Sequence, residues 1–163
     1  MSVFFTTKNF IVESHPKPFV SRTDGGHIRI RVKDETIPDR TKLSPDQAIE
    51  LMWLTMIVGE AMELGMNKLG IPVVKINYEE LGNWAYKPGG GHAFLHVHVF
   101  GRAKNAVKQP FPEAVYLPDR STGFYDGFEP LTADDEKTIL EIITSLQKQE
   151  KYSSPVWGQT YQS

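Results

Sequence analysis

The stretch GGGHAFLHVHVFGR, residues 89–102, contains three of the five histidines of the chain, directly after three glycines. In an extended strand, successive side chains point to opposite faces of the sheet. His96 and His98 therefore share one face with two phenylalanines, whereas Leu95 and the neighbouring valines share the other. The alternation predicts a strand that packs on an apolar core with one face and carries two imidazoles on the other.

The length and composition of the chain limit the classes of protein to which it can belong. With 163 residues, 40% hydrophobic content and a formal net charge of −2, the chain is expected to be a single globular domain over residues 1–163. The small net charge argues against a nucleic-acid partner. The absence of cysteine excludes disulfides and thiolate metal sites. Because the sequence shows neither an export signal nor a long apolar run, we expect a cytoplasmic protein without a membrane partner.

Two helices are expected. Ser44 is a typical N-cap for a long helix that ends near Gly70. Closer to the C-terminus, Thr132 precedes acidic residues and a stripe of isoleucines, which predicts a closing helix over about residues 132–150.

Residues 103–130 are rich in proline and glycine with weak periodicity, so we expect them to form an extended surface segment.

Strands are expected on both sides of the long helix. Residues 25–33, GGHIRIRVK, alternate apolar and basic side chains, which predicts a strand with Arg29 and Arg31 on a solvated face. Residues 71–80 form a second candidate, and residues 9–20, broken by prolines, predict one or two short edge strands. Because no regular strand–helix alternation is present, the fold class is α+β, with an antiparallel sheet of about five strands and the long helix on one face.

The residues alone leave three interpretations of the histidine pair open. A neutral imidazole can attack phosphorus through its unprotonated nitrogen, and glycines ahead of the strand let backbone N–H groups approach phosphate oxygens. Two strand histidines could instead hold a metal ion, although the first acidic residue after His98 is Glu113. They could also be half-exposed residues of an edge strand without any ligand.

Three segments resemble the histidine triad (HIT) family. FLHVHVFGR, residues 94–102, is similar to the family signature of three histidines alternating with apolar residues, with the first triad histidine replaced by Phe94. GGHIRIRVK is similar to the upstream strand of the family, and KINYEE, residues 75–80, to the strand that supplies an asparagine. The order of the segments also matches, and the resemblance covers about residues 10–105.

The resemblance implies a HIT-like fold and a nucleotide hydrolase or nucleotidyltransferase that acts on a phosphoanhydride or phosphoramidate, with no metal or other cofactor. His96 would accept the nucleotidyl group, His98 would bind and polarise the phosphate, and His27 would support both through hydrogen bonds. The resemblance further implies a nucleotide as the small-molecule substrate and a homodimer as the assembly.

Four further residues are expected near the substrate. The resemblance implies that Asn77 contacts the phosphate or ribose, and that Gly89 and Gly91 belong to the phosphate cradle ahead of the triad. His92 would lie on the same strand face as His96 and His98, because an even number of residues separates them. It lies four residues before His96, however, which is about 13 Å along a strand. We therefore expect His92 to be a loop residue that touches the leaving group.

The sequence departs from the family pattern at two places. Phe94 removes one imidazole and cannot donate a hydrogen bond, and Glu35 stands where many members have another histidine. Phe94 keeps open the alternative of a non-catalytic nucleotide-binding sensor. The pairing of the strand histidines keeps open a metal-dependent enzyme with His96 and His98 as ligands.

Overall fold

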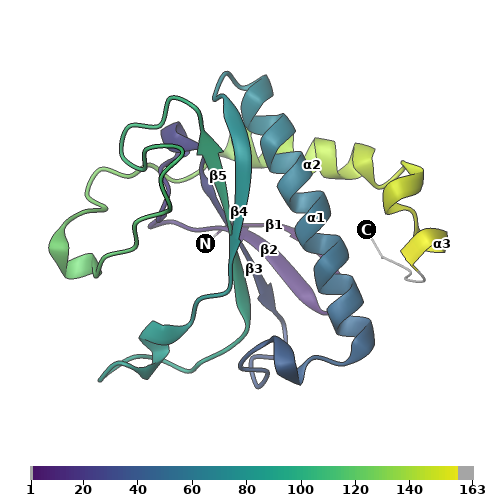
Figure 1. Ribbon diagram of the computed structural model, residues 1–163. Coiled ribbons are helices and arrows are strands. Elements are labelled where there is room, and N and C mark those ends of the chain that lie inside the picture. The colour runs from purple at the N-terminus through teal and green to yellow at the C-terminus, as the bar shows by residue number, and fades with distance from the viewer. Residues whose placement is uncertain (1, 158–163) are drawn as a thin grey trace.

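The computed structural model describes residues 2–157, which form one five-stranded sheet with helices packed on it (Figure 1). The strands are β1 (Ser2–Thr6), β2 (Phe10–Ser14), β3 (His27–Val32), β4 (Val73–Glu79) and β5 (His96–Ala103). Their order across the sheet is β1-β2-β3-β5-β4, and each neighbouring pair is antiparallel. The predicted α+β class and antiparallel sheet are confirmed.

The two long helices begin where the sequence predicts. α1 (Pro45–Lys68) and α2 (Ala133–Leu146) each follow a capping box, with Ser44 and Thr132 as the capping residues. α1 packs on β4 and β5, and α2 packs on α1 and β1 (Figure 1). Apolar side chains of both helices and of one sheet face form a single core. A short helix, α3 (Ser154–Trp157), follows, and no helix within residues 2–157 is long and apolar enough to span a membrane.

The N-terminal strands differ from the expectation. Residues 9–20 contain one strand, β2, and it lies inside the sheet between β1 and β3 rather than at an edge. β1 forms one edge of the sheet. The sequence did not predict β1 because its apolar residues do not alternate with polar ones. Its pairing with β2 is interrupted between Val3 and Phe5. The prolines at 16 and 18 follow β2, so they do not interrupt its ladder.

Residues 104–130, called the strap below, lie on the sheet face opposite to α1. Phe100 of β5 forms a second apolar cluster there with Phe19, Val20 and Tyr125. The expectation of an irregular surface segment is confirmed, because only Gln109 and Tyr125 of the strap are buried, and the strap also covers this sheet face. Its anchor is the buried Arg102, whose Nη2 donates to the carbonyls of Gln109, Pro110 and Glu113 at 3.2, 3.0 and 2.9 Å. Bonds to main-chain carbonyls leave no periodic pattern in a sequence.

Candidate functional site

Strand register places the histidines on the sheet face away from the main core. β3 and β5 pair so that His27 lies opposite Phe100, Arg29 opposite His98 and Arg31 opposite His96. The alternate residues of both strands, such as Ile30 and Val97, are buried in the main core. A shift of register by one residue would bury the imidazoles in that core, so the apolar alternation holds them on the other face.

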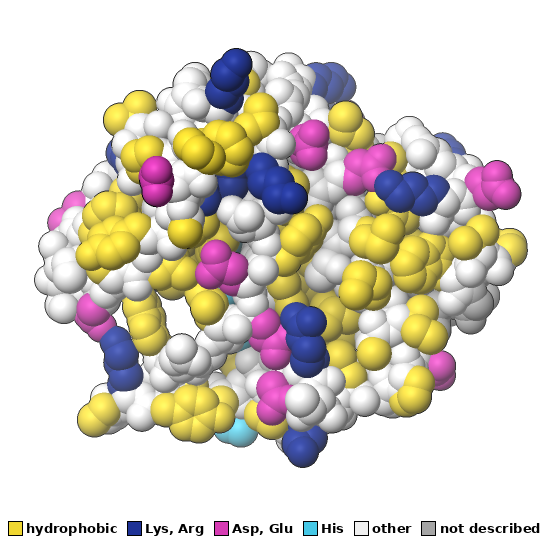
Figure 2. Space-filling model, viewed as in Figure 1, with side chains coloured by type: hydrophobic (Ala, Val, Ile, Leu, Met, Phe, Trp, Pro, Cys, Tyr) yellow, Lys and Arg dark blue, Asp and Glu magenta, His cyan; other side chains and the backbone are white. Residues whose placement is uncertain are grey.

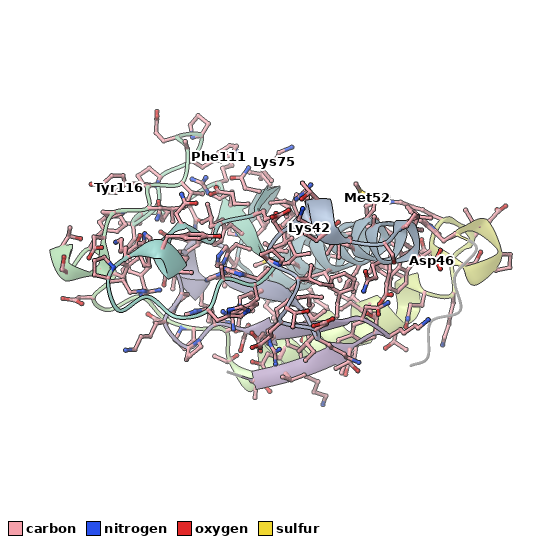
Figure 3. All side chains as sticks on the ribbon, turned by 90° about the horizontal axis from the view of Figure 1, so that it is seen from below. Lys42, Asp46, Met52, Lys75, Phe111 and Tyr116 are labelled. Atoms are coloured by element: carbon pink, nitrogen blue, oxygen red, sulfur yellow. The ribbon has the colours of Figure 1, made fainter. Side chains whose placement is uncertain are left out.

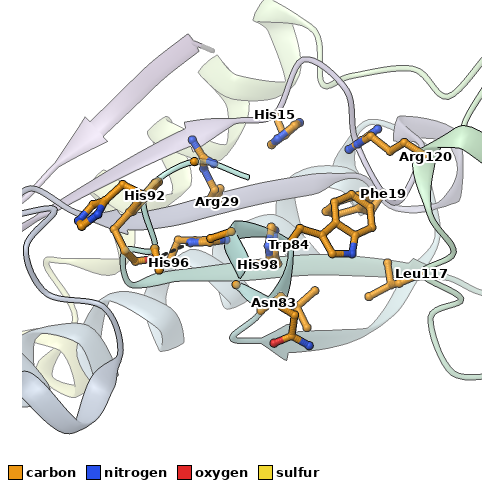
Figure 4. A pocket seen from close by; sticks show the side chains of 16 residues that line it. His15, Phe19, Arg29, Asn83, Trp84, His92, His96, His98, Leu117 and Arg120 are labelled. Atoms are coloured by element: carbon orange, nitrogen blue, oxygen red, sulfur yellow. Dashed lines mark hydrogen bonds between the residues drawn. The ribbon is translucent and has the colours of Figure 1, made fainter. Parts of the chain in front are cut away.

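A cavity of about 430 Å³ lies over this face (Figure 4). His96 and His98 form part of its floor, and the loop before β5 and the strap contribute its walls. Its lining consists of His15, Phe19, Arg29, Leu81, Gly82, Asn83, Trp84, Ala85, Gly91, His92, Ala93, Phe94, His96, His98, Leu117 and Arg120. The site is therefore a concave and mostly apolar pocket with a few polar groups, as small-molecule sites usually are.

The tautomer of His96 is set by its own strand. Nδ1 of His96 lies 2.9 Å from the carbonyl oxygen of Phe94. Because a carbonyl oxygen can only accept, Nδ1 carries the proton and donates it to this bond. The other ring nitrogen, Nε2, is then unprotonated and has a lone pair available for attack on an electrophile. Phe94 thus contributes through its main chain, a role that any residue type can fill.

The tautomer of His98 is the opposite one, and a chain of two hydrogen bonds sets it. The backbone N–H of Phe19 donates to Nδ1 of His27 at 3.2 Å, so the proton of His27 lies on Nε2. That Nε2 lies 2.8 Å from Nδ1 of His98 and donates to it. His98 therefore carries its proton on Nε2 and is a hydrogen-bond donor through that atom. Adjacent cavity residues thus supply one nucleophilic nitrogen and one N–H donor.

Burial keeps these imidazoles neutral. It is the main cause that lowers the pKa of His96 below its ordinary value of 6.5, and the positive charge of Arg29 lowers it further. Burial likewise lowers the pKa of His98 to about 2 and holds the pKa of His27 well below 6.5. At neutral pH each ring therefore carries one proton, as the hydrogen-bond pattern requires.

Arg29 is a cavity residue, so its assignment to a solvated face is wrong. Its Nε donates to Oε1 of Glu13 at 2.7 Å, and its side chain is only 11% exposed. The guanidinium carbon also lies 5.9 Å from the centre of the Phe94 ring. Arg31 bonds the same Glu13 and also Glu35, and its side chain is 22% exposed. The sequence error arose because alternation shows which residues share a face but not what covers that face.

The remaining predicted residues divide into two groups. Gly91 and His92 line the cavity, and Nε2 of His92 lies 2.7 Å from the carbonyl oxygen of Glu35. Gly89 is outside the lining but has a φ of +74°, a conformation that favours glycine. Asn77 is also outside the lining, and its Oδ1 accepts a hydrogen bond from Nη1 of Arg102 at 3.0 Å. The structure therefore uses Asn77 to orient the strap anchor.

The cavity residues that sequence reasoning missed include an imidazole, a phenyl and a guanidinium group. His15 stacks on His27 with ring centres 5.2 Å apart, and Phe19 lies 5.5 Å from the same ring. Arg120 reaches the cavity from the strap. His15 and Phe19 precede β3 in an irregular segment, and Arg120 lies over 100 residues after His15. No local pattern links such residues, although the scarcity of histidine was a signal that His15 deserved a role.

Three solved structures have a similar fold. A hypothetical histidine triad nucleotide-binding protein from Sulfolobus tokodaii matches with a TM-score of 0.58 and 14% identity, covering 91% of this chain and 87% of the other. A Hit-like protein involved in cell-cycle regulation from Bartonella henselae matches with a TM-score of 0.54 and 11% identity, covering 86% and 85%. A zinc-bound histidine triad family protein from Mycobacterium smegmatis matches with a TM-score of 0.55 and 15% identity, covering 90% and 88%.

Comparison by sequence gives no relatives of this kind: no protein-family model and no curated protein matches the chain. The three structural matches extend over 86–91% of this chain and 85–88% of the others. At identities of 11–15% they bear on the fold and leave the activity open. The chain has the fold of the histidine triad proteins.

Proposed function

We propose that this protein is a nucleotide hydrolase or nucleotidyltransferase that forms a covalent nucleotidyl intermediate on His96. The observation that carries the proposal is the pair of opposite tautomers at His96 and His98. One neutral ring offers a lone pair, and its neighbour, 4.9 Å away between ring centres, offers an N–H group. This combination suits attack on a phosphorus atom whose oxygens gain negative charge in the transition state.

The reaction proceeds in two displacements. Nε2 of His96 attacks the α-phosphorus, a phosphorus–nitrogen bond forms, and the bond to the leaving group breaks. The leaving group departs with that electron pair and takes up a proton from solvent, while the N–H of His98 stabilises the phosphate oxygens. Water or another acceptor then attacks phosphorus and loses a proton, which releases the nucleotide and restores neutral His96. Two steps replace one difficult displacement because the imidazolium is itself a good leaving group.

The neighbours in the structural comparison bear on this proposal through their printed descriptions. One is described as a nucleotide-binding protein, which supports a nucleotide as the ligand of the cavity here. Another is described as zinc-bound, which keeps the metal-dependent alternative in the test. Within residues 2–157, however, no group of three or more histidine or acidic side chains is arranged to hold a metal ion. The donor set therefore fits the nucleophile better than a metal site.

The test is single-turnover trapping of the intermediate. Protein is mixed with substrates carrying a labelled α-phosphate, a diadenosine polyphosphate and adenosine 5′-phosphoramidate, and is then denatured. We expect label on the wild-type chain, with or without a chelator, and none on His96→Ala. Label on His96→Ala equal to wild type would refute the nucleophile. Activity that disappears with the chelator and returns with zinc would favour the metal-dependent enzyme, and tight nucleotide binding without label would favour the sensor.

We also propose that the protein assembles as a homodimer through β4 and α1. β4 ends the sheet, so within residues 2–157 no strand lies beside its outer backbone groups. Figure 2 shows hydrophobic side chains over this region, and Met52 of α1 lies on the same side of the molecule as Lys75 of β4 (Figure 3). Met52, Leu64, Val74 and Tyr78 are 55%, 48%, 46% and 47% exposed. Such a patch beside an open strand edge is typical of an interface.

A further inference from the structure

The cavity has a cationic end that the proposed chemistry does not use. Figure 4 shows Arg120 and Phe19 at the opposite end of the pocket from His92 and His96. The Arg120 guanidinium carbon lies 4.4 Å from the centre of the Phe19 ring and 5.0 Å from that of Tyr125. Its Nη2 donates to the carbonyl oxygen of Lys17 at 2.7 Å. Two aromatic faces and one hydrogen bond therefore hold this charge in place.

No ion pair joins Arg120 to a carboxylate within residues 2–157. The neighbouring Asp119 is paired with Lys87 instead. Arg29, the other arginine of the cavity, is already neutralised by Glu13. A half-buried guanidinium without a counter-charge is costly unless an anion completes its surroundings. The cavity wall at Arg120 is thus suited to a negatively charged group.

His15 adds a neutral donor to the same wall. The backbone N–H of Lys17 donates to Nδ1 of His15 at 3.1 Å, so the proton of this ring lies on Nε2. The ring stacks nearly parallel on His27, with an angle of 8° between the planes, and lines the cavity. Burial, together with the charges of Arg29 and Arg120, lowers the pKa of His15 to about 4. At neutral pH His15 therefore offers an N–H without adding charge.

We infer that Arg120 and His15 form an anion subsite that binds the leaving group of the substrate, and that this subsite selects leaving groups bearing phosphate over uncharged amines. The inference rests on the proposed function, in which the α-phosphate lies at His96 and His98. In this inference the leaving group extends from that phosphate along the cavity toward Arg120 and therefore away from His92, which replaces the expectation that His92 touches the leaving group. A fixed guanidinium at its far end binds a phosphate in the ground state and stabilises the charge that develops as the bond breaks.

The experiment compares two substrates that share one nucleotidyl group. A diadenosine polyphosphate releases a negatively charged adenosine 5′-polyphosphate, whereas adenosine 5′-phosphoramidate releases ammonia. Arg120→Gln should lower kcat/KM for the polyphosphate by about 10- to 100-fold, the loss typical of a hydrogen bond to a charged group. It should change kcat/KM for the phosphoramidate less than about threefold. His15→Phe keeps the ring stack and should cost the polyphosphate about 2- to 10-fold.

Two further variants separate charge recognition from structure. Arg120→Lys keeps the charge and should recover part of the loss on the polyphosphate. Lys108→Gln removes a charge from the same strap at a residue that stacks on Phe128 and lies outside the cavity lining. Lys108→Gln should leave both substrates unaffected. Equal losses on both substrates for Arg120→Gln, or no loss on either, would overturn the subsite.

A binding measurement keeps this inference distinct from the proposed function. Calorimetry with inorganic pyrophosphate should show binding to wild type and to His96→Ala, and binding at least about 10-fold weaker to Arg120→Gln. If wild type forms no covalent intermediate but pyrophosphate binding depends on Arg120, the proposed function fails and the subsite stands. If pyrophosphate binds Arg120→Gln as well as wild type, the subsite fails whatever the result of the trapping experiment.

Discussion

Replacement of His27 by phenylalanine is the sharpest test of how the two tautomers arise. His27 is fully buried and joins two groups, the backbone N–H of Phe19 and Nδ1 of His98. Phenylalanine preserves the ring but neither accepts from the first group nor donates to the second. The variant therefore leaves one buried donor and one buried acceptor without partners while the packing volume stays nearly constant.

The expected magnitudes follow from those two lost bonds. Each buried polar group left without a partner costs about 1–3 kcal/mol, so the free energy of unfolding should fall by about 2–6 kcal/mol. For a chain of this size, Tm should fall by about 4 °C at the least. The proton of His98 is also no longer held on Nε2. We expect kcat to fall at least about 10-fold. The loss should not exceed the 10²- to 10³-fold that is typical when a transition-state hydrogen-bond donor is removed.

The assay measures kcat and Tm for His27→Phe beside two other variants. His27→Gln can still donate to His98 and should recover part of the lost kcat. Ile143→Ala creates a cavity in the core around α2, far from the site, and should lose about 2–5 kcal/mol of stability with kcat nearly unchanged below its Tm. If His27→Phe retained the wild-type kcat and Tm, the hydrogen-bond chain would have neither the structural nor the catalytic role assigned to it.

Three further predictions concern charge and assembly. Because burial lowers the pKa of His96, the acid limb of kcat/KM should lie below pH 6.5, and a limb at or above 6.5 in the pH profile would contradict a buried, neutral nucleophile. Burial alone would raise the pKa of Asp135, but hydrogen bonds from Arg22 and Thr132 lower the pKa below its ordinary value of 3.8. The ionised Asp135 therefore stabilises the fold above about pH 4, and this stabilisation is lost as the pH falls through the pKa of the folded state. Arg22→Ala should therefore cost about 2 kcal/mol or more at pH 7 and less at pH 3 in urea unfolding, because the side chain of Asp135 is fully buried. Val74→Lys should convert the proposed dimer to a monomer in sedimentation experiments, whereas a wild-type chain that sediments as a monomer would rule out that assembly.

The sequence predicted the elements whose signals are local. The capping residues Ser44 and Thr132 marked both long helices, and alternation identified β3 and β5 with the face on which His96 and His98 lie. Alternation cannot show which strands become neighbours, so the contact between His27 and His98 was implied only by the family resemblance. It also could not show that β2 is internal, because that depends on β1, a short strand without clean alternation that pairs with β2 across the turn at residues 7–9.

The parts that could not be predicted depend on long-range contacts of irregular segments. Arg29 was assigned to solvent because nothing in its own strand indicates that the strap and the loop before β5 cover that face. Arg120 and His15 both line the cavity and both bond the backbone of Lys17, although they belong to segments without periodicity. Their positions follow from main-chain hydrogen bonds, such as those of Arg120 to Lys17 and of Arg102 to the strap. Bonds of this kind involve the backbone, and side-chain patterns do not record them.

The reacting groups of the cavity lie on regular backbone, and the groups proposed to recognise the leaving group lie on irregular backbone. The nucleophile and the N–H donor lie on β5, where neighbouring strands and the Phe94 carbonyl determine the orientation of each ring. The groups proposed to recognise the leaving group lie on the strap and before β3, outside the strands of the sheet. The strap is also tied to the loop before β5 by the ion pair of Lys87 with Asp119, next to Arg120. Substrate preference can therefore change through the strap while the reacting pair on β5 stays in place.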